Sequence, residues 1–372
     1  MTSRTRLAAA LLAVLSLAAC EGVLEPGERD QEQIVFLRYA DASRTNSPRD
    51  SADIYRINAD GTGLRNLTDH LAQYSSVSAS PDGRTVLFTS NRGGTNGRIW
   101  RMNSDGSGLR QITTESTGSP RWSPDGNRIA FMMAGHVHVV GADGGTPVKV
   151  SEPAMQVGTS CPSSTATNIV LVGWIGAGRI AFARGYCGFG YRYFLVNADG
   201  TGFVQTDIRL FEAHFSPDGS KVLFPEFEGG FARVMLMNSD GTGRRALVTQ
   251  GKSQGLPWGS YSPWSADGKR IVFFASDNAA PIASPQSCTD GALPYVVNVD
   301  GSGVKRLMDT CIGFFNGWSA SGDHVAFTIF PATAPFPLSV PDVHVAKSDG
   351  TGAVNATNSP FWESDAVWLS GR

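Results

Sequence analysis

The stretch Asn58-Ala-Asp-Gly-Thr-Gly63 is the first of seven copies of one phrase. The other copies read Asn103-Ser-Asp-Gly-Ser-Gly108, Gly141-Ala-Asp-Gly-Gly145, Asn197-Ala-Asp-Gly-Thr-Gly202, Asn238-Ser-Asp-Gly-Thr-Gly243, Asn298-Val-Asp-Gly-Ser-Gly303 and Lys347-Ser-Asp-Gly-Thr-Gly352. Asp-Gly favours a tight hairpin, because both residues tolerate the positive φ angles that such a turn needs. The mean spacing from Asp60 to Asp349 is about 48 residues, a period typical of propellers and solenoids.

A second phrase, Ser80-Pro-Asp-Gly83, alternates with the first. Its further copies read Ser123-Pro-Asp-Gly126, Ser216-Pro-Asp-Gly219, Ser265-Ala-Asp-Gly268 and Ser319-Ala-Ser-Gly322. An aromatic residue usually precedes this turn, as Trp122 does, and Trp174 marks a degenerate copy ahead of Gly178. A short apolar strand that ends in Phe follows it, as in Ile129-Ala-Phe131. We therefore predict a repeating unit of four strands: an aromatic strand, a Phe strand, the strand before Asp-Gly and a short outer strand.

The two ends of the repeat array complete each other. Ile34-Val-Phe36 is a Phe strand without its aromatic strand, and Ala366-Val-Trp368 is an aromatic strand without its Phe partner. Pairing them closes a ring and leaves no exposed sheet edge, whereas an open solenoid would need capping repeats. We predict an all-β fold over residues 34–372: a seven-bladed β-propeller of four-stranded antiparallel blades, closed by its N- and C-terminal strands.

The interleaved turns resemble the repeat of TolB-type propellers, which are related to WD-type repeats. The resemblance implies the architecture, but the family's best-known members place a separate α/β domain before six blades. This sequence has one blade more and a short polar segment in that place, so the family's partner-binding role is not carried over. Similar blades also occur in prolyl-oligopeptidase-like peptidases and in some polysaccharide lyases, so any activity has to be argued from site residues.

The N-terminal segment has the pattern of a lipoprotein signal peptide. Two arginines and an apolar run precede Leu17-Ala-Ala-Cys20. We expect residues 1–19 to be removed and Cys20 to be lipidated; the alternative is a cleaved signal with an unlipidated cysteine. Residues 20–33 are polar and acidic, which suits a flexible tether. Glu21 is not the aspartate of an inner-membrane retention signal, which favours an exported protein anchored in the outer membrane, facing the periplasm or the cell surface.

Composition argues against several classes of partner. The chain has 31 Lys and Arg against 33 Asp and Glu, so it lacks the basic field that neutralises phosphates, and we expect no nucleic acid. We expect contact with the membrane through the lipid anchor only. His136 and His138 lie on one face of a strand, but a packed or solvated pair is the simpler interpretation because no third ligand lies nearby in sequence. The Asp-Gly spacing fits turns and not an EF-hand loop, so we expect no metal and no cofactor.

Evidence for catalysis in the sequence is thin. We assign every Gly-x-Ser or Ser-x-Gly fragment, such as Ser107-Gly108, to the hairpin repeat, and so expect no Gly-x-Ser-x-Gly string of a nucleophile elbow on a hydrolase domain. His214 stands where other blades place the strand that lines the central channel, with packing as its alternative role. Arg121 and Glu212 also lie near inner strands. Acid–base catalysis needs such groups within reach of one substrate, and we assign no catalytic residue.

Four further cysteines form an even number in a chain that we expect to be exported, which favours disulfides. By strand order, Cys161 and Cys187 lie in loops on one face of a blade, and Cys288 and Cys311 lie in the same loop types around another. We predict those two pairs; four free thiols are the alternative. Long insertions at residues 38–52, 276–294 and 330–341 emerge on that same face.

Aromatic and arginine side chains near these loops are candidates for protein or sugar contacts. The candidates are Arg184, Tyr186, Phe189, Tyr191, Trp258 and Tyr261. Packing between blades is an alternative role for Tyr191 and Trp258. The sequence thus predicts a lipid-anchored, noncatalytic binding platform of the cell envelope, with an envelope protein or a cell-wall or capsular glycan as partner. The alternative is a polysaccharide lyase or hydrolase that acts at the mouth of the central channel.

Overall fold

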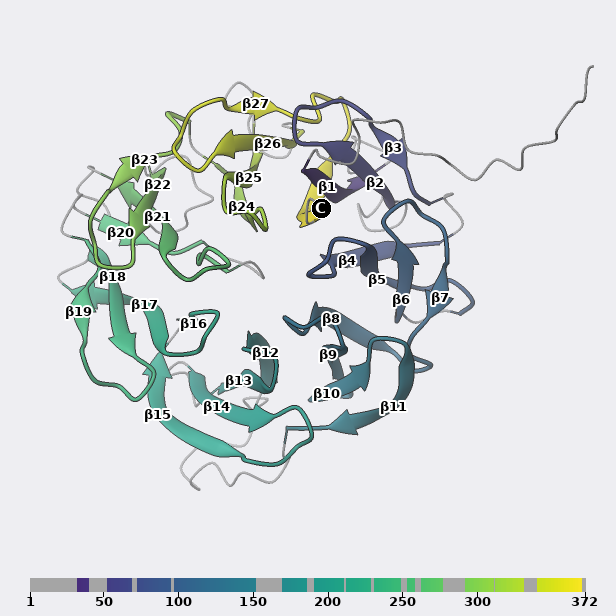
Figure 1. Cartoon of the computed structure of the whole chain (residues 1–372), viewed down its shortest axis with the longest axis horizontal. Helices are drawn as coiled ribbons and strands as arrows, with labels where there is room; N and C mark the ends of the chain where they lie inside the picture. Colours follow the sequence, from purple (N-terminus) through teal and green to yellow (C-terminus); the bar gives the residue numbers. More distant parts are fainter. Residues whose placement is uncertain are drawn as a thin grey trace, which may run out of the picture.

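Seven four-stranded sheets surround a central axis in the computed structural model of the chain (Figure 1). The structure describes residues 32–39, 52–68, 72–94, 97–151, 169–185, 191–210, 212–228, 231–248, 253–257, 262–276, 292–310, 312–330 and 340–369. Every regular element within these residues is a β-strand, and all strand pairs are antiparallel. The predicted fold class is confirmed.

We number the blades in chain order, each from its inner to its outer strand. Blade 1 contains β28 (Glu363–Leu369), β1 (Gln33–Tyr39), β2 (Ala52–Asn58) and β3 (Arg65–Asn66), and blade 2 contains β4 (Tyr74–Ala79), β5 (Thr85–Ser90), β6 (Arg98–Asn103) and β7 (Arg110–Gln111). Blade 3 contains β8 (Thr117–Trp122), β9 (Arg128–Met133), β10 (His136–Gly141) and β11 (Gly144–Lys149), and blade 4 contains β12 (Ile169–Ile175), β13 (Arg179–Gly185), β14 (Tyr191–Asn197) and β15 (Val204–Leu210). Blade 5 contains β16 (His214–Phe215), β17 (Lys221–Glu228), β18 (Phe231–Asn238) and β19 (Arg245–Ala246). Blade 6 contains β20 (Ser253–Gly255), β21 (Arg270–Ser276), β22 (Leu293–Asn298) and β23 (Lys305–Arg306), and blade 7 contains β24 (Phe314–Trp318), β25 (His324–Ile329), β26 (Asp342–Lys347) and β27 (Val354–Asn355).

The ring closes within blade 1, where the last strand, β28, pairs with the first, β1. Ile34 lies opposite Trp368, as the two incomplete repeats predicted. A buried ion pair adds to this closure, because Arg38 donates from Nε and Nη2 to Glu363 Oε1 at 2.9 and 2.7 Å. Arg38 also lies over the rings of Phe36 and Tyr55, so its charge is held among aromatic faces.

The Ser-Pro-Asp-Gly turns satisfy their own polar groups. In blade 3, Ser123 Oγ donates to Asp125 Oδ1 at 2.5 Å and accepts from the Arg128 amide at 2.9 Å. Asp125 Oδ1 also accepts from the Asn127 amide at 3.1 Å. Gly126 has a φ of +70°, an angle that glycine adopts without strain. The turn is therefore fixed locally by its four residues, which explains why the same letters recur at the same point of the fold.

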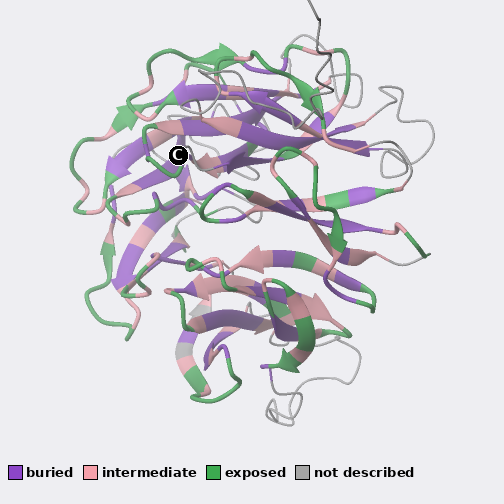
Figure 2. Ribbon diagram, turned by 45° about the vertical axis from the view of Figure 1, so that its right-hand side comes forward, coloured by how far each residue is buried: buried purple, intermediate pink, exposed green. Residues whose placement is uncertain are grey.

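The core lies between neighbouring blades, where the Phe of each second strand is buried (Figure 2). Indole N–H groups add hydrogen bonds across these junctions. The bonds run to backbone oxygens of the preceding blade: Trp174 to Arg121 at 3.1 Å, Trp264 to His214 at 3.1 Å, Trp318 to Pro263 at 3.0 Å and Trp368 to Gly317 at 3.1 Å. In these four blades the aromatic residue before the turn therefore joins one blade to the next. Phe215, the aromatic of blade 5, has no donor and cannot make this bond to blade 4.

Candidate functional site

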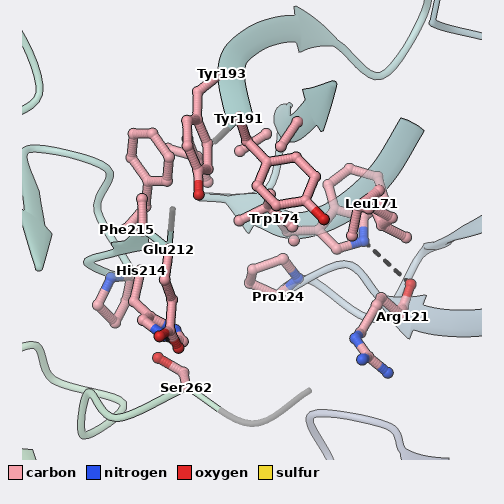
Figure 3. Close-up of a pocket in the computed structure, with 18 of the residues that line it drawn as sticks. Arg121, Pro124, Leu171, Trp174, Tyr191, Tyr193, Glu212, His214, Phe215 and Ser262 are labelled. Atoms are coloured by element: carbon pink, nitrogen blue, oxygen red, sulfur yellow. Dashed lines mark hydrogen bonds and ion pairs between the residues drawn. The ribbon is translucent and has the colours of Figure 1, made fainter. Parts of the chain in front are cut away.

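A cavity of about 650 Å³ lies along the inner strand of blade 4, between blades 3 and 5 (Figure 3). Its lining residues are Arg121, Trp122, Pro124, Val170, Leu171, Val172, Gly173, Trp174, Ile175, Ala181, Ala183, Tyr191, Tyr193, Glu212, Ala213, His214, Phe215, Pro217 and Ser262. Aromatic and aliphatic side chains form most of the wall. This volume is within the range of small-molecule sites, which are mostly apolar with a few convergent polar groups.

Small side chains on β13 make room for the cavity. Blade 3 and blade 4 share the string Arg-Ile-Ala-Phe at the start of their Phe strands, but the next residue is Met132 in blade 3 and Ala183 in blade 4. Ala181 and Ala183 face the apolar cluster shared with blade 5. The equivalent pairs in the seven blades are Val35 and Leu37, Leu87 and Thr89, Ala130 and Met132, Ala181 and Ala183, Leu223 and Pro225, Val272 and Phe274, and Ala326 and Thr328. Only blade 4 carries two alanines at this pair of positions.

The inner strand of blade 4 lacks a side chain beside these alanines. Arg121, Gly173 and His214 occupy the same register position on blades 3, 4 and 5, one residue before the aromatic. Gly173 has no side chain, and a Cβ atom built there would meet nothing within 4 Å. The cavity is therefore flanked at the axis by a cation on one side and an imidazole on the other, with open space between them.

A hydrogen-bonded pair stands on the blade 5 side of the cavity. His214 Nε2 lies 2.7 Å from Glu212 Oε1, and the two side chains are 13% and 27% exposed. Burial, followed by the nearby Glu212 carboxylate, raises the pKa of the Tyr193 hydroxyl. Tyr193 therefore stays protonated at neutral pH and keeps a hydroxyl donor near this carboxylate.

Arg121 connects the cavity to the central channel. A second cavity of about 360 Å³ is lined by inner segments of several blades and shares Arg121, Pro217 and Ser262 with the first. Across the ring, desolvation raises the pKa of the Asp365 carboxyl, and the Arg121 charge opposes this shift. The guanidinium Nη1 also donates to the Pro120 carbonyl at 3.3 Å. The cavity thus has an apolar interior and a polar side toward the axis.

The three channel candidates from the sequence all line this cavity: His214, Arg121 and Glu212 (Figure 3). Of the proposed binding-face residues, Tyr191 lines it too and packs against the cluster between blades 4 and 5. Arg184 lies on β13 opposite Ile169. The other candidates, Tyr186, Phe189, Trp258 and Tyr261, and the cysteines Cys20, Cys161, Cys187, Cys288 and Cys311 lie outside the described residues.

Sequence reasoning missed the residues that give the cavity its volume. Ala181 and Ala183 carry no functional group, so a search for reactive side chains passes over them. Their signal is a difference from the other six Phe strands at matched positions. Ser262 and Tyr193 were also missed, because Ser262 belongs to neither repeated phrase and Tyr193 is one of four consecutive buried residues on β14.

The expectation that the hairpin repeat accounts for every Gly-x-Ser fragment was wrong. Residues 251–255 read Gly-Lys-Ser-Gln-Gly, which matches the string of a nucleophile elbow. Ser253 is nevertheless fully buried at the start of β20, the inner strand of blade 6. An elbow needs its serine exposed at a sharp turn from strand to helix, so Ser253 is a packing residue.

The two histidines of β10 also have structural surroundings. His138 is stacked on Phe131 with ring centroids 5.9 Å apart, and burial lowers its pKa. His136 Nδ1 lies 3.4 Å from Ser151 Oγ. In the described part of the chain, no three His, Cys, Asp or Glu side chains gather as a metal site would require. Within that part there is also no helix of the length and apolar character that would span a membrane.

Comparison with protein families agrees with the repeat. Residues 42–154 match the family model described as the TolB beta propeller domain. This matched part, less than a third of the chain, is similar to the TolB repeat. No curated protein sequence matches the chain.

Solved structures share the propeller fold at low identity. TolB from Acinetobacter baumannii is 14% identical with a TM-score of 0.50, and the match covers 91% of this chain and 67% of that one. An oligogalacturonate lyase from Vibrio parahaemolyticus is 11% identical with a TM-score of 0.57, covering 87% of this chain and 85% of that one. A prolyl endopeptidase is 12% identical with a TM-score of 0.58, and this chain spans 50% of its length. At such identities the likeness shows the fold alone.

Proposed function

We propose that this protein is an exported, noncatalytic binding propeller, anchored to the outer membrane through lipid on Cys20, that holds its ligand in the cavity of blade 4. The single observation that carries the proposal is the cavity itself. Blade 4 alone carries two alanines at the matched pair of positions on its Phe strand, Gly173 leaves open space beside them, and aromatic rings with a few polar groups surround that space. The partner class expected from the sequence is an envelope protein or a cell-wall or capsular glycan. The predicted disulfides at Cys161 with Cys187 and Cys288 with Cys311 would brace one face.

Photo-crosslinking in cells tests this function. A photoreactive amino acid is placed at Val170, which lines the cavity and is 43% exposed. The matched control is Val148, which is 45% exposed on the outer strand of blade 3 and lies away from the cavity. Mass spectrometry then identifies any adduct. A third chain combines the Val170 probe with Ala183→Met, which fills the space with the residue that blade 3 carries.

An adduct at position 170 that is absent at 148 and lost with Ala183→Met is the expected result. Adducts of equal yield at both positions, or at neither, would overturn binding in the cavity. The mass of the adduct separates a protein partner from a glycan or a smaller molecule. Melting temperatures of all three chains are measured alongside, because a misfolded chain would lose its adduct for another reason.

A polysaccharide lyase is the second candidate, favoured by the His214 and Glu212 pair at 2.7 Å. His214 would take the proton from the carbon beside a uronate carboxylate, while the glycosidic bond on the adjacent carbon breaks and the leaving oxygen is protonated. The test is to incubate the chain with acidic polysaccharides and to follow the conjugated double bond of the product. Product formation that His214→Ala abolishes would replace the noncatalytic proposal; its absence would exclude the lyase.

A further inference from the structure

We propose that the cavity of blade 4 takes an aromatic group that bears a carboxylate, with the ring in the apolar interior and the carboxylate on Arg121. This inference rests on the proposed binding function and names the chemistry of its ligand. Two sources present this chemistry: a free aromatic acid and a polypeptide that ends in an aromatic residue with its α-carboxylate.

The interior of the cavity selects for a ring. The faces of Trp174, Tyr191, Tyr193 and Phe215 border it (Figure 3), and the alanines of β13 leave the space between these rings unfilled. Aromatic pairs gain attraction from offset or edge-to-face contact beyond the area that they bury. Trp174 is already fixed by its bond to the Arg121 carbonyl, so this wall needs no reorganisation when a ligand enters.

The polar side of the cavity selects for an anion. Arg121 is the only Lys or Arg among the lining residues that the structure describes, whereas the charge of Glu212 is engaged by His214 at 2.7 Å. A guanidinium presents paired N–H donors that match the two oxygens of a carboxylate. Arg121 stands at the junction with the channel, so an anionic group held there lies at the polar end of an otherwise apolar space.

Asp365, on β28, also responds to the Arg121 charge. Desolvation raises the pKa of the Asp365 carboxyl, and the Arg121 charge opposes this shift. The guanidinium therefore already acts on a carboxyl group of an inner strand.

Calorimetry on the purified full-length chain tests the ligand chemistry with four probes. Naphthoate carries both features, naphthamide keeps the ring without the charge, octanoate replaces the ring with a flexible chain, and glucuronate keeps the charge on a sugar. We expect naphthoate to bind more tightly than each of the others. Arg121→Gln should weaken naphthoate by about tenfold or more and leave naphthamide unchanged. The control Arg110→Gln removes an exposed charge from the outer strand of blade 2 and should have no effect.

Ala183→Met should abolish binding of naphthoate and naphthamide together, because it removes the space for either ring. Naphthoate binding that is unaffected by Arg121→Gln, or equal binding of octanoate or glucuronate, would overturn the proposal. A short acetylated peptide ending in Phe, compared with its C-terminal amide, separates the two sources: a peptide acid that binds more tightly than naphthoate supports a polypeptide end. If naphthoate fails while the Val170 crosslink succeeds, the ligand chemistry is wrong and the binding function stands; failure of both overturns the function.

Discussion

The junction between blades 3 and 4 and the junction between blades 4 and 5 are built from the same repeat but differ in how they are filled. On the blade 3 side, Met132 packs against the shared cluster and Trp174 donates across the junction. On the blade 5 side, Ala183 leaves space and Phe215 has no N–H to donate. One junction is sealed and the other holds a cavity.

The difference teaches where function can arise in a repeat protein. The buried Phe recurs at every blade and the turn phrases recur at most of them, so they define the fold and carry no information about a ligand. A site appears where one blade departs from the others in volume or in a donor group. In this chain the departures fall together on blade 4, beside Arg121 and the pair of Glu212 and His214.

The largest effect is expected where the ring closes within blade 1. A buried ion pair between Arg38 and Glu363 stabilises this closure. Arg38→Ala removes the cationic partner of Glu363, whose side chain is fully buried, and leaves the carboxyl with neutral partners such as Ser359 Oγ, which donates at 2.8 Å. Loss of one member of a buried pair costs about 3 to 5 kcal/mol of unfolding free energy. Denaturant unfolding measures the loss, with Arg110→Ala as the exposed control.

Partial recovery should follow when both charges are removed. The double variant Arg38→Met with Glu363→Leu replaces the pair by apolar side chains, so it should be more stable than Arg38→Ala alone. An Arg38→Ala chain as stable as the Arg110→Ala control would show that the ion pair does not seal the ring.

Met132→Ala should convert the sealed junction into an open one. The substitution removes a partly buried side chain that packs on the cluster between blades 3 and 4, so we expect a cost of about 1 to 2 kcal/mol, at or below the low end for fully buried Met to Ala changes. A fall in the denaturant midpoint without a change in slope is the expected observation. Unchanged stability would mean that the junction tolerates empty space and that its filling has no role.

Ala183→Met is the reciprocal change and should have a smaller effect on stability. The methionine enters existing space, so we expect a change within about 1 kcal/mol in either direction, together with loss of ligand binding. Thermal unfolding and ligand titration are measured on the same sample. A large destabilisation would indicate that the cavity is too narrow for the side chain and that its walls do not move apart.

Much of the fold could be predicted from sequence because its signals are local. Asp125 and Gly126 fix a turn by hydrogen bonds within a few residues. The seven copies of the other Asp-Gly hairpin give the blade count. The closure also follows from complementary ends, as the pairing of Ile34 with Trp368 confirms.

The site could be predicted only in part, because its volume comes from packing. Arg121, Glu212 and His214 could be selected from the sequence, because they are titratable residues that the strand order places near the inner strands. The space between them depends on Ala181 and Ala183, and an alanine in a strand signals either close packing or a void. The neighbouring blade decides between close packing and a void. In blade 5, Phe215 stands where other blades have a tryptophan, whose larger ring fills more space and whose N–H bonds to the preceding blade.

The smallest expected effect is a difference in acid sensitivity between the turns of blades 3 and 5 and the matching turn of blade 4. Hydrogen bonds from Ser123 and Ser216 lower the pKa values of Asp125 and Asp218 below the ordinary 3.8, whereas blade 4 has no aspartate in its matching turn. Because the folded-state pKa values are lowered, the stabilisation is present above pH 3.8 and is lost as the pH falls through those lowered values.

Hydrogen exchange at single residues can detect this loss. The amides of Asn127 and Ser220 donate to Asp125 and Asp218, so their protection should fall as these carboxylates gain protons. The amide of Ala198 donates to the Gly178 carbonyl in blade 4 and should keep its protection over the same range. Parallel loss at all three amides would mean that acid unfolds the ring as one unit, and that the turns of blades 3 and 5 do not differ from that of blade 4 in their dependence on charge.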